Sequence, residues 1–90
     1  MKVLKIGAEW CSGCLVMRSR WTEIEKENPW LKTEYYDFDR DKKVIEKYQI
    51  ASGRLPVFIF LDKSGKEFLR FHGEPSKKEL IRIVSENKGK

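Results

Sequence analysis

The only two cysteines of the chain, Cys11 and Cys14, stand two residues apart at the end of an apolar run and the start of a helical pattern. This spacing lets the two sulfur atoms meet across one helical turn, which is typical of a dithiol–disulfide couple. The first cysteine is expected at the helix N-terminus, where unpaired backbone N–H groups and the helix dipole favour a thiolate. The pattern therefore predicts a redox pair in which Cys11 is the attacking sulfur.

The length and composition of the chain indicate one small domain. Ninety residues can bury one core but not two. A secreted module held together by disulfides would carry a larger even number of cysteines. No apolar stretch is long enough for a signal peptide or a membrane span, so we expect a cytoplasmic protein without a membrane partner. We also expect a monomer.

The net charge of +5 raises the question of a nucleic-acid partner. Nucleic-acid-binding surfaces usually gather basic residues in a stripe, often with aromatic side chains between them. Here lysines and arginines alternate with acidic residues along the whole chain. The charge therefore predicts an ordinary solvated surface and no nucleic-acid partner.

Strand and helix signals alternate along the chain. Strands are expected in four short runs rich in β-branched or aromatic residues, at 2–7, 33–38, 57–61 and 67–72. Apolar residues at helical spacing predict helices over 12–28 and 42–48, and a third that begins after Ser76. The second helix has an N-cap within Asp39-Arg40-Asp41, and Ser76 with Glu79 has the spacing of a capping box for the third.

This order predicts an α/β fold. The sequence β-α-β-α-β-β-α places a right-handed crossover between the first two strands and an antiparallel hairpin at the last two. We expect a three-layer sandwich over residues 1–90, with a four-stranded mixed sheet in the order 2-1-3-4. The run 57–61, apolar throughout, should be a buried central strand.

Several short motifs together resemble the thioredoxin family, and the resemblance covers nearly all of the chain. These motifs are Ala8-Glu9-Trp10-Cys11 with Cys14, Asp37 and Asp39, Lys47-Tyr48 with Ile50, Leu55-Pro56, Lys63-Ser64-Gly65-Lys66-Glu67, and Gly73. A cysteine pair followed by a proline at the start of a buried strand is the most specific part. The family's additional N-terminal strand and helix have no counterpart, which predicts a smaller core.

The resemblance implies a thioredoxin-like fold and a thiol–disulfide oxidoreductase with no cofactor other than the disulfide of Cys11 and Cys14. Cys11 would be the nucleophile and Cys14 the resolving thiol. Trp10 would supply a flat apolar platform beside the disulfide. Pro56 would follow a cis peptide bond, with the backbone of Leu55 pairing with an extended substrate segment.

The same resemblance implies a role in cell redox homeostasis. Further substrate-contacting positions would be Ser12, Gly13, Arg54 and Gly73. The partners would be protein disulfides and a recycling system, either of the thioredoxin reductase type or based on glutathione.

Some positions depart from the family pattern. Ser12-Gly13 replaces the usual Gly-Pro between the cysteines, and an apparent insertion between Ile50 and Pro56 brings Arg54 close to the expected substrate edge. Lys5 occupies the position of the family's buried acid. A buried ammonium without a carboxylate partner is costly, and no acid is obviously placed to pair with it. We therefore expect the Lys5 charge to reach water, with its apolar stem covering the sheet.

Two other functions compete with this hypothesis. One is a glutaredoxin-like reductase that uses glutathione. The other is a metal-binding or interaction module in which Cys11 and Cys14 hold zinc or an iron–sulfur cluster. His72 is the only histidine, so one chain does not supply four ligands of the usual kinds, although a dimer could supply four thiolates. We therefore predict no metal site.

Overall fold

The computed structural model describes residues 1–90. Four strands, three α-helices and one short 3₁₀ turn follow one another as β1 (Lys2–Gly7), α1 (Ser12–Glu27), β2 (Lys32–Asp37), α2 (Lys42–Lys47), η1 (Ser52–Arg54), β3 (Val57–Leu61), β4 (Glu67–His72) and α3 (Lys77–Glu86). Three strands have the predicted bounds, whereas β2 begins and ends one residue earlier than predicted.

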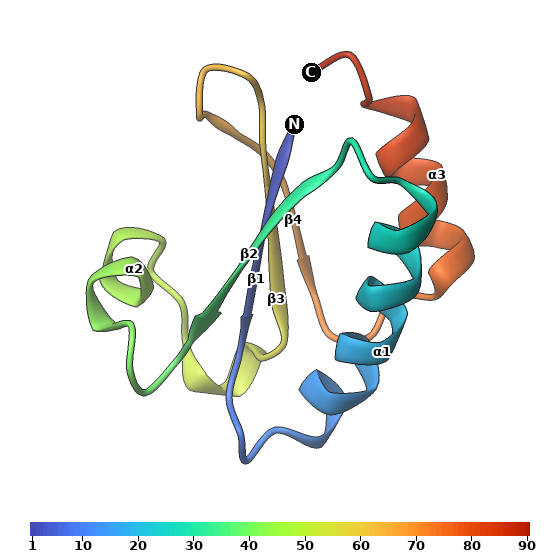
Figure 1. Ribbon diagram of the computed structural model, residues 1–90. Helices are drawn as coiled ribbons and strands as arrows, with labels where there is room; N and C mark the ends of the chain where they lie inside the picture. Colours follow the sequence, from blue (N-terminus) through green and yellow to red (C-terminus); the bar gives the residue numbers. More distant parts are fainter.

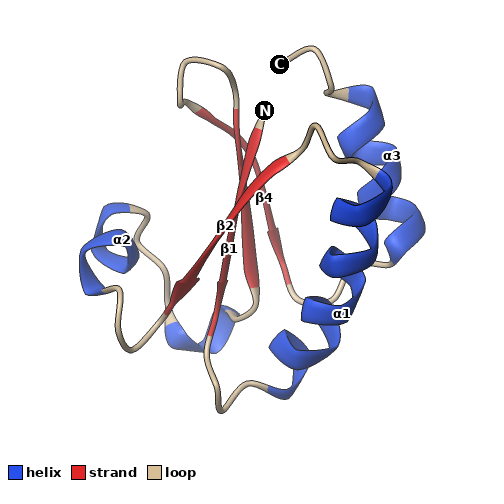
Figure 2. Ribbon diagram, in the orientation of Figure 1, coloured by secondary structure: helices blue, strands red, loops and turns tan.

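The four strands form one mixed sheet in the order β2-β1-β3-β4, as predicted. β1 is parallel to β2, whereas β3 is antiparallel to both β1 and β4. Helices α1 and α3 cover one face of the sheet and α2 lies on the other, so the fold has three layers (Figure 1). The loop from β1 to α1 therefore emerges at one end of the sheet, next to the 3₁₀ turn that precedes β3 (Figure 2).

Each face of the sheet has its own core. On the α1 and α3 face, the fully buried Trp21 packs against Phe58 and Phe60, with ring centroids 5.5 and 6.3 Å apart. On the α2 face, Ile45 and Ile50 form a smaller buried cluster with the residues of β1 and β3 that lie on that face. Because β3 contributes to both clusters, all five of its residues are buried, as its apolar run predicts.

The helix N-caps only partly follow the prediction. The Ser76 hydroxyl accepts the backbone N–H of Glu79 at 3.1 Å, which confirms the cap of α3. Asp41 occupies the N-cap position of α2, but its side chain makes no capping hydrogen bond. It accepts the backbone N–H of Asp37 at 2.7 Å instead. The N-cap position thus lies within the predicted segment, but a donor at the end of an edge strand takes the carboxylate that could have capped the helix.

No helix combines the length and the apolar character that a membrane crossing requires.

Candidate active site

Cys11 is the N-cap residue of α1, and Cys14 lies in its first turn. The two are joined by a disulfide, with their Cα atoms 5.3 Å apart. The Cys11 sulfur accepts the backbone N–H of Cys14 at 3.2 Å, and no acidic residue belongs to the first turn of α1. These local dipoles favour negative charge on the Cys11 sulfur once the disulfide is reduced.

Cys14 lies on the inner face of α1 and is only 9% exposed. It shares a buried stripe with Met17, Trp21 and Ile24, as the helical spacing predicts. Gly7 of β1 makes this position possible, because a Cβ atom on Gly7 would lie only 3.0 Å from the Cys14 sulfur. A glycine in a strand often marks such a close approach.

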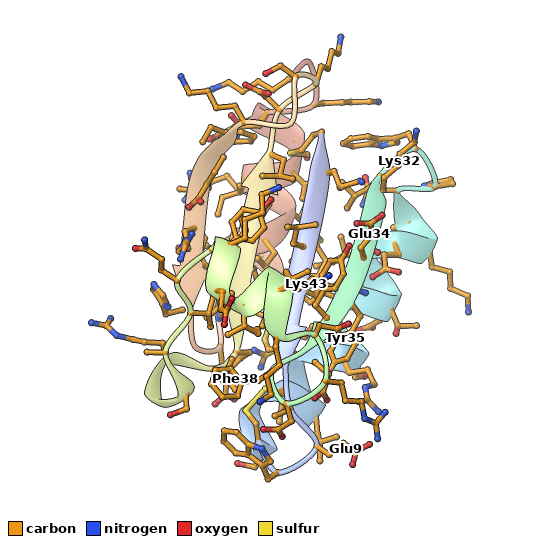
Figure 3. The ribbon with its side chains drawn as sticks, turned by 90° about the vertical axis from the view of Figure 1, so that its left-hand side faces the viewer. Glu9, Lys32, Glu34, Tyr35, Phe38 and Lys43 are labelled. Carbon is orange, nitrogen blue, oxygen red and sulfur yellow. A yellow bond between two sulfur atoms is a disulfide. The ribbon has the colours of Figure 1, made fainter.

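A small cavity of about 40 Å³ lies behind Cys14. Residues of α1 and all strands but β4 line it, among them Lys5, Gly7, Cys14, Trp21, Tyr35 and Pro56. Figure 3 shows Tyr35 on β2, in the lower part of the view, where the yellow disulfide also lies. Burial raises the pKa of the Tyr35 hydroxyl above its ordinary value, the charge of Asp37 adds to the rise, and Arg18 opposes it.

Trp10 directly precedes Cys11 in the chain and is 58% exposed. Its indole N–H donates to the Asp39 carboxylate at 2.8 Å, and its ring meets that of Phe38 edge-on at 6.3 Å. Asp39 is itself held by its backbone N–H, which donates to the Asp37 carboxylate at 2.8 Å. The large exposed ring is therefore fixed in orientation, which suits it to contact a partner.

The Leu55–Pro56 peptide bond is cis, as predicted. Pro56 lines the same cavity as Cys14, and its carbonyl accepts the backbone N–H of Gly73 at 2.8 Å. Gly73 has a φ of +89°, a conformation that favours glycine. The fold therefore brings Pro56, Gly73 and Cys14 together from three separate segments, while Leu55 packs on the α2-side core.

The other predicted contact residues differ in their relation to the disulfide. Ser12 is exposed at the first position of α1. Gly13 lies under the side chain of Glu74, since a Cβ atom on Gly13 would lie 2.9 Å from a Glu74 carboxylate oxygen. Arg54 is exposed in η1 and makes no side-chain hydrogen bond or ion pair. Sequence reasoning missed Glu74, although its place directly after Gly73 was an available signal.

The expectation for Lys5 was wrong in one respect. Its ammonium does have an acidic partner, because Nζ lies 2.8 Å from Oε2 of Glu25. The two side chains are 20% and 33% exposed, so the pair is partly shielded from water. Glu25 lies three turns beyond Cys14 along α1, so the ion pair draws the Lys5 charge away from the disulfide. Lys5 and Glu25 are far apart in the chain, so no local sequence pattern could reveal that they form a pair.

No three or more His, Cys, Asp or Glu side chains are grouped so that they could hold a metal ion. A metal centre at Cys11 and Cys14 would therefore need ligands from a second molecule.

The sheet topology, a disulfide at the N-terminus of α1 and a proline that lines the cavity behind Cys14 define a protein of the thiol–disulfide oxidoreductase class. The family model described as Thioredoxin matches residues 1–86, and the chain belongs to the thioredoxin family. The similarity to the family therefore extends over both the fold and the cysteine pair.

Individual relatives agree with this assignment. The chain is 31% identical over 80 residues to a thioredoxin of Chlamydia trachomatis serovar D, covering 89% of this chain and 76% of that protein. The X-ray structure of Fasciola hepatica thioredoxin superposes with a TM-score of 0.84 at 27% identity, covering 96% of this chain and 79% of that one. Thioredoxin 1 of Thermosipho africanus gives 0.81 at 26% identity, with coverages of 96% and 92%.

Proposed function

We propose that this protein reduces disulfide bonds in protein substrates, with Cys11 as the nucleophile and Cys14 as the resolving thiol. The observation that carries this assignment is the unequal placement of the two sulfurs. Cys11 is half-buried at the helix N-cap and accepts a backbone N–H, whereas Cys14 lies buried behind it. A thiolate is the reactive form, and the helix terminus favours it at Cys11.

The reaction proceeds in two displacements. The Cys11 thiolate attacks one substrate sulfur, forming a mixed disulfide and releasing the other substrate sulfur, which takes a proton. The Cys14 thiol then loses its proton and attacks the Cys11 sulfur. The bond between Cys11 and the substrate breaks, and the second substrate sulfur leaves as a thiol. Two electrons pass to the substrate, and the protein ends as the Cys11–Cys14 disulfide.

The substrate is expected to lie across the end of the sheet. The Trp10 ring offers an apolar platform, and the backbone of Leu55, directly before the cavity-lining Pro56, would pair with an extended segment. Gly73 borders this path through its hydrogen bond to Pro56, and the exposed Arg54 would contact acidic substrate residues.

Recycling requires a reductant for the Cys11–Cys14 disulfide. We propose a flavin-dependent reductase of the thioredoxin reductase type, because the family assignment rests on thioredoxins. A reducing compartment such as the cytoplasm would suit a dithiol that works as a reductant.

The test is reduction of insulin disulfides, coupled to NADPH through either a thioredoxin reductase or glutathione with glutathione reductase. Turnover with the first system is expected to exceed turnover with the second. Activity with glutathione alone would favour the glutaredoxin-like alternative, and no activity with either would contradict the proposed function.

A further inference from the structure

The second displacement has a requirement that the first does not. Cys14 must lose a proton before it attacks, yet burial disfavours a thiolate at this position. A nearby group must therefore receive the proton. None of the residues that line the cavity behind Cys14 carries a carboxylate.

The charged groups around the cavity are paired with other groups, are cations that cannot accept a proton, or lie outside its lining. The Lys5 ammonium is paired with Glu25, and the Asp37 carboxylate accepts the backbone N–H groups of Asp39 and Arg40. The remaining charged side chains are those of Glu9 in the loop before α1, Arg18 on α1 and Glu74 above Gly13. None of these acids contributes to the cavity lining.

One hydroxyl remains in the lining, that of Tyr35. The Tyr35 hydroxyl lies 3.4 Å from the point where a Cβ atom on Gly7 would stand, and the Cys14 sulfur lies 3.0 Å from the same point. The cavity that Tyr35 and Cys14 line, about 40 Å³ in volume, has room for a water molecule.

We propose that this cavity binds a water molecule, held by the Tyr35 hydroxyl, which accepts the Cys14 proton in the resolving step. The inference rests on the proposed role of Cys14. The water passes a proton to the Tyr35 oxygen as Tyr35 releases its own toward solvent, so the net change is one proton lost to bulk water. Tyr35 is 47% exposed, so it connects the cavity with the surface. Its raised pKa keeps it protonated, and thus able to relay, near neutral pH.

The test uses Tyr35→Phe, which removes the hydroxyl and keeps the ring. The matched control is Tyr36→Phe, because Tyr36 is the next residue of β2, packs on the α2-side core and donates its hydroxyl to Glu34. The probe is the aromatic disulfide dithionitrobenzoate, which releases one coloured thiol when Cys11 attacks. A second coloured thiol is released when Cys14 resolves the adduct.

Tyr35→Phe is expected to slow the second release about tenfold without changing the first. This is less than the roughly 10²-fold or more that a positioned proton acceptor usually contributes, because bulk water can partly replace the hydroxyl. Tyr36→Phe should leave both releases unchanged. In both variants and the wild type, the rates are followed from about pH 5.5 to pH 9, and the deficit of Tyr35→Phe should shrink as hydroxide takes over at high pH.

Two results would overturn parts of this picture in distinguishable ways. A second release in Tyr35→Phe that stays within about twofold of the wild type would refute the inference. A second release that persists in Cys14→Ser would instead refute the proposed role of Cys14.

Discussion

The exposed surface around Cys11 and Trp10, here called the rim, differs in nearly every physical respect from the cavity behind Cys14. The two cysteines are nevertheless only one helical turn apart. The rim is open to solvent, rests on backbone dipoles of α1 and carries the exposed Trp10 ring. The cavity is lined by α1 and three strands, and its lining includes the Tyr35 hydroxyl but no carboxylate. Attack is thus favoured on one side of the disulfide, and controlled proton release on the other.

The largest effect should come from exchanging the two sulfurs for oxygen. Cys11→Ser is expected to lower disulfide reduction by about 10³-fold or more, because it removes the nucleophile. Cys14→Ser should still attack, and should therefore accumulate mixed disulfides with its substrates. The insulin assay measures the first effect, and gel analysis without reductant detects the mixed disulfides. Iodoacetamide labelling of the native dithiol compares the reactivity of the two thiols. Equal labelling of the two thiols would abolish the distinction between rim and cavity.

The next largest effect is expected on stability, when either of two glycines is replaced by alanine. Gly7 borders the cavity and Gly13 borders the rim. Gly7→Ala would place a Cβ 3.0 Å from the buried Cys14 sulfur, and overpacking of this kind costs about 1–3 kcal/mol. Gly13→Ala would meet only the end of the flexible Glu74 side chain, so its stability should stay within about 0.5 kcal/mol of the wild type.

Urea unfolding of the oxidised variants compares the two free energies of unfolding. A Gly13→Ala variant as unstable as Gly7→Ala would show that Glu74 is held rigidly. In that case the rim would be as tightly packed as the cavity.

A smaller effect is expected at the Trp10 platform. Asp39→Ala removes the acceptor of the indole N–H, and one such hydrogen bond is worth about 0.5–1.5 kcal/mol. The KM for a protein disulfide should rise a few-fold while kcat stays the same, because only the orientation of the platform changes. Glu9→Ala is the control, since it removes an exposed ion pair with Arg40 from the same loop. A change in kcat instead of KM would place Asp39 in the chemical step.

The smallest effect is expected at Lys5. Glu25 draws the ammonium away from the disulfide, so Lys5→Ala should leave the pKa of both thiols nearly unchanged. Thiolate absorbance, titrated in Cys11→Ser and Cys14→Ser backgrounds, reports each thiol separately. A shift of about one pKa unit at Cys14 would correspond to about 1.4 kcal/mol and would show that the Lys5 charge acts on the cavity.

The local elements were predictable because their signals lie within a few residues. The run at β3 is buried throughout, and the Ser76 cap forms as its spacing with Glu79 predicts. The N-cap of α2 falls at Asp41, within the predicted segment Asp39-Arg40-Asp41, but the Asp41 carboxylate does not cap the helix because a backbone donor at the end of β2 competes for it. Neighbouring residues in the chain do not show which of two donors such an acceptor meets.

The sequence by itself determined the redox pair, its place at a helix N-terminus, the strand order and the cis-proline, since each follows from spacing, periodicity or family resemblance. Only the tertiary structure decided what surrounds Cys14. The register of β1 against β2 sets Lys5 opposite Tyr35, and the docking of α1 brings Glu25 to Lys5 and Trp21 to the cavity. These contacts depend on the packing of whole elements against one another, and no spacing along the chain encodes that packing.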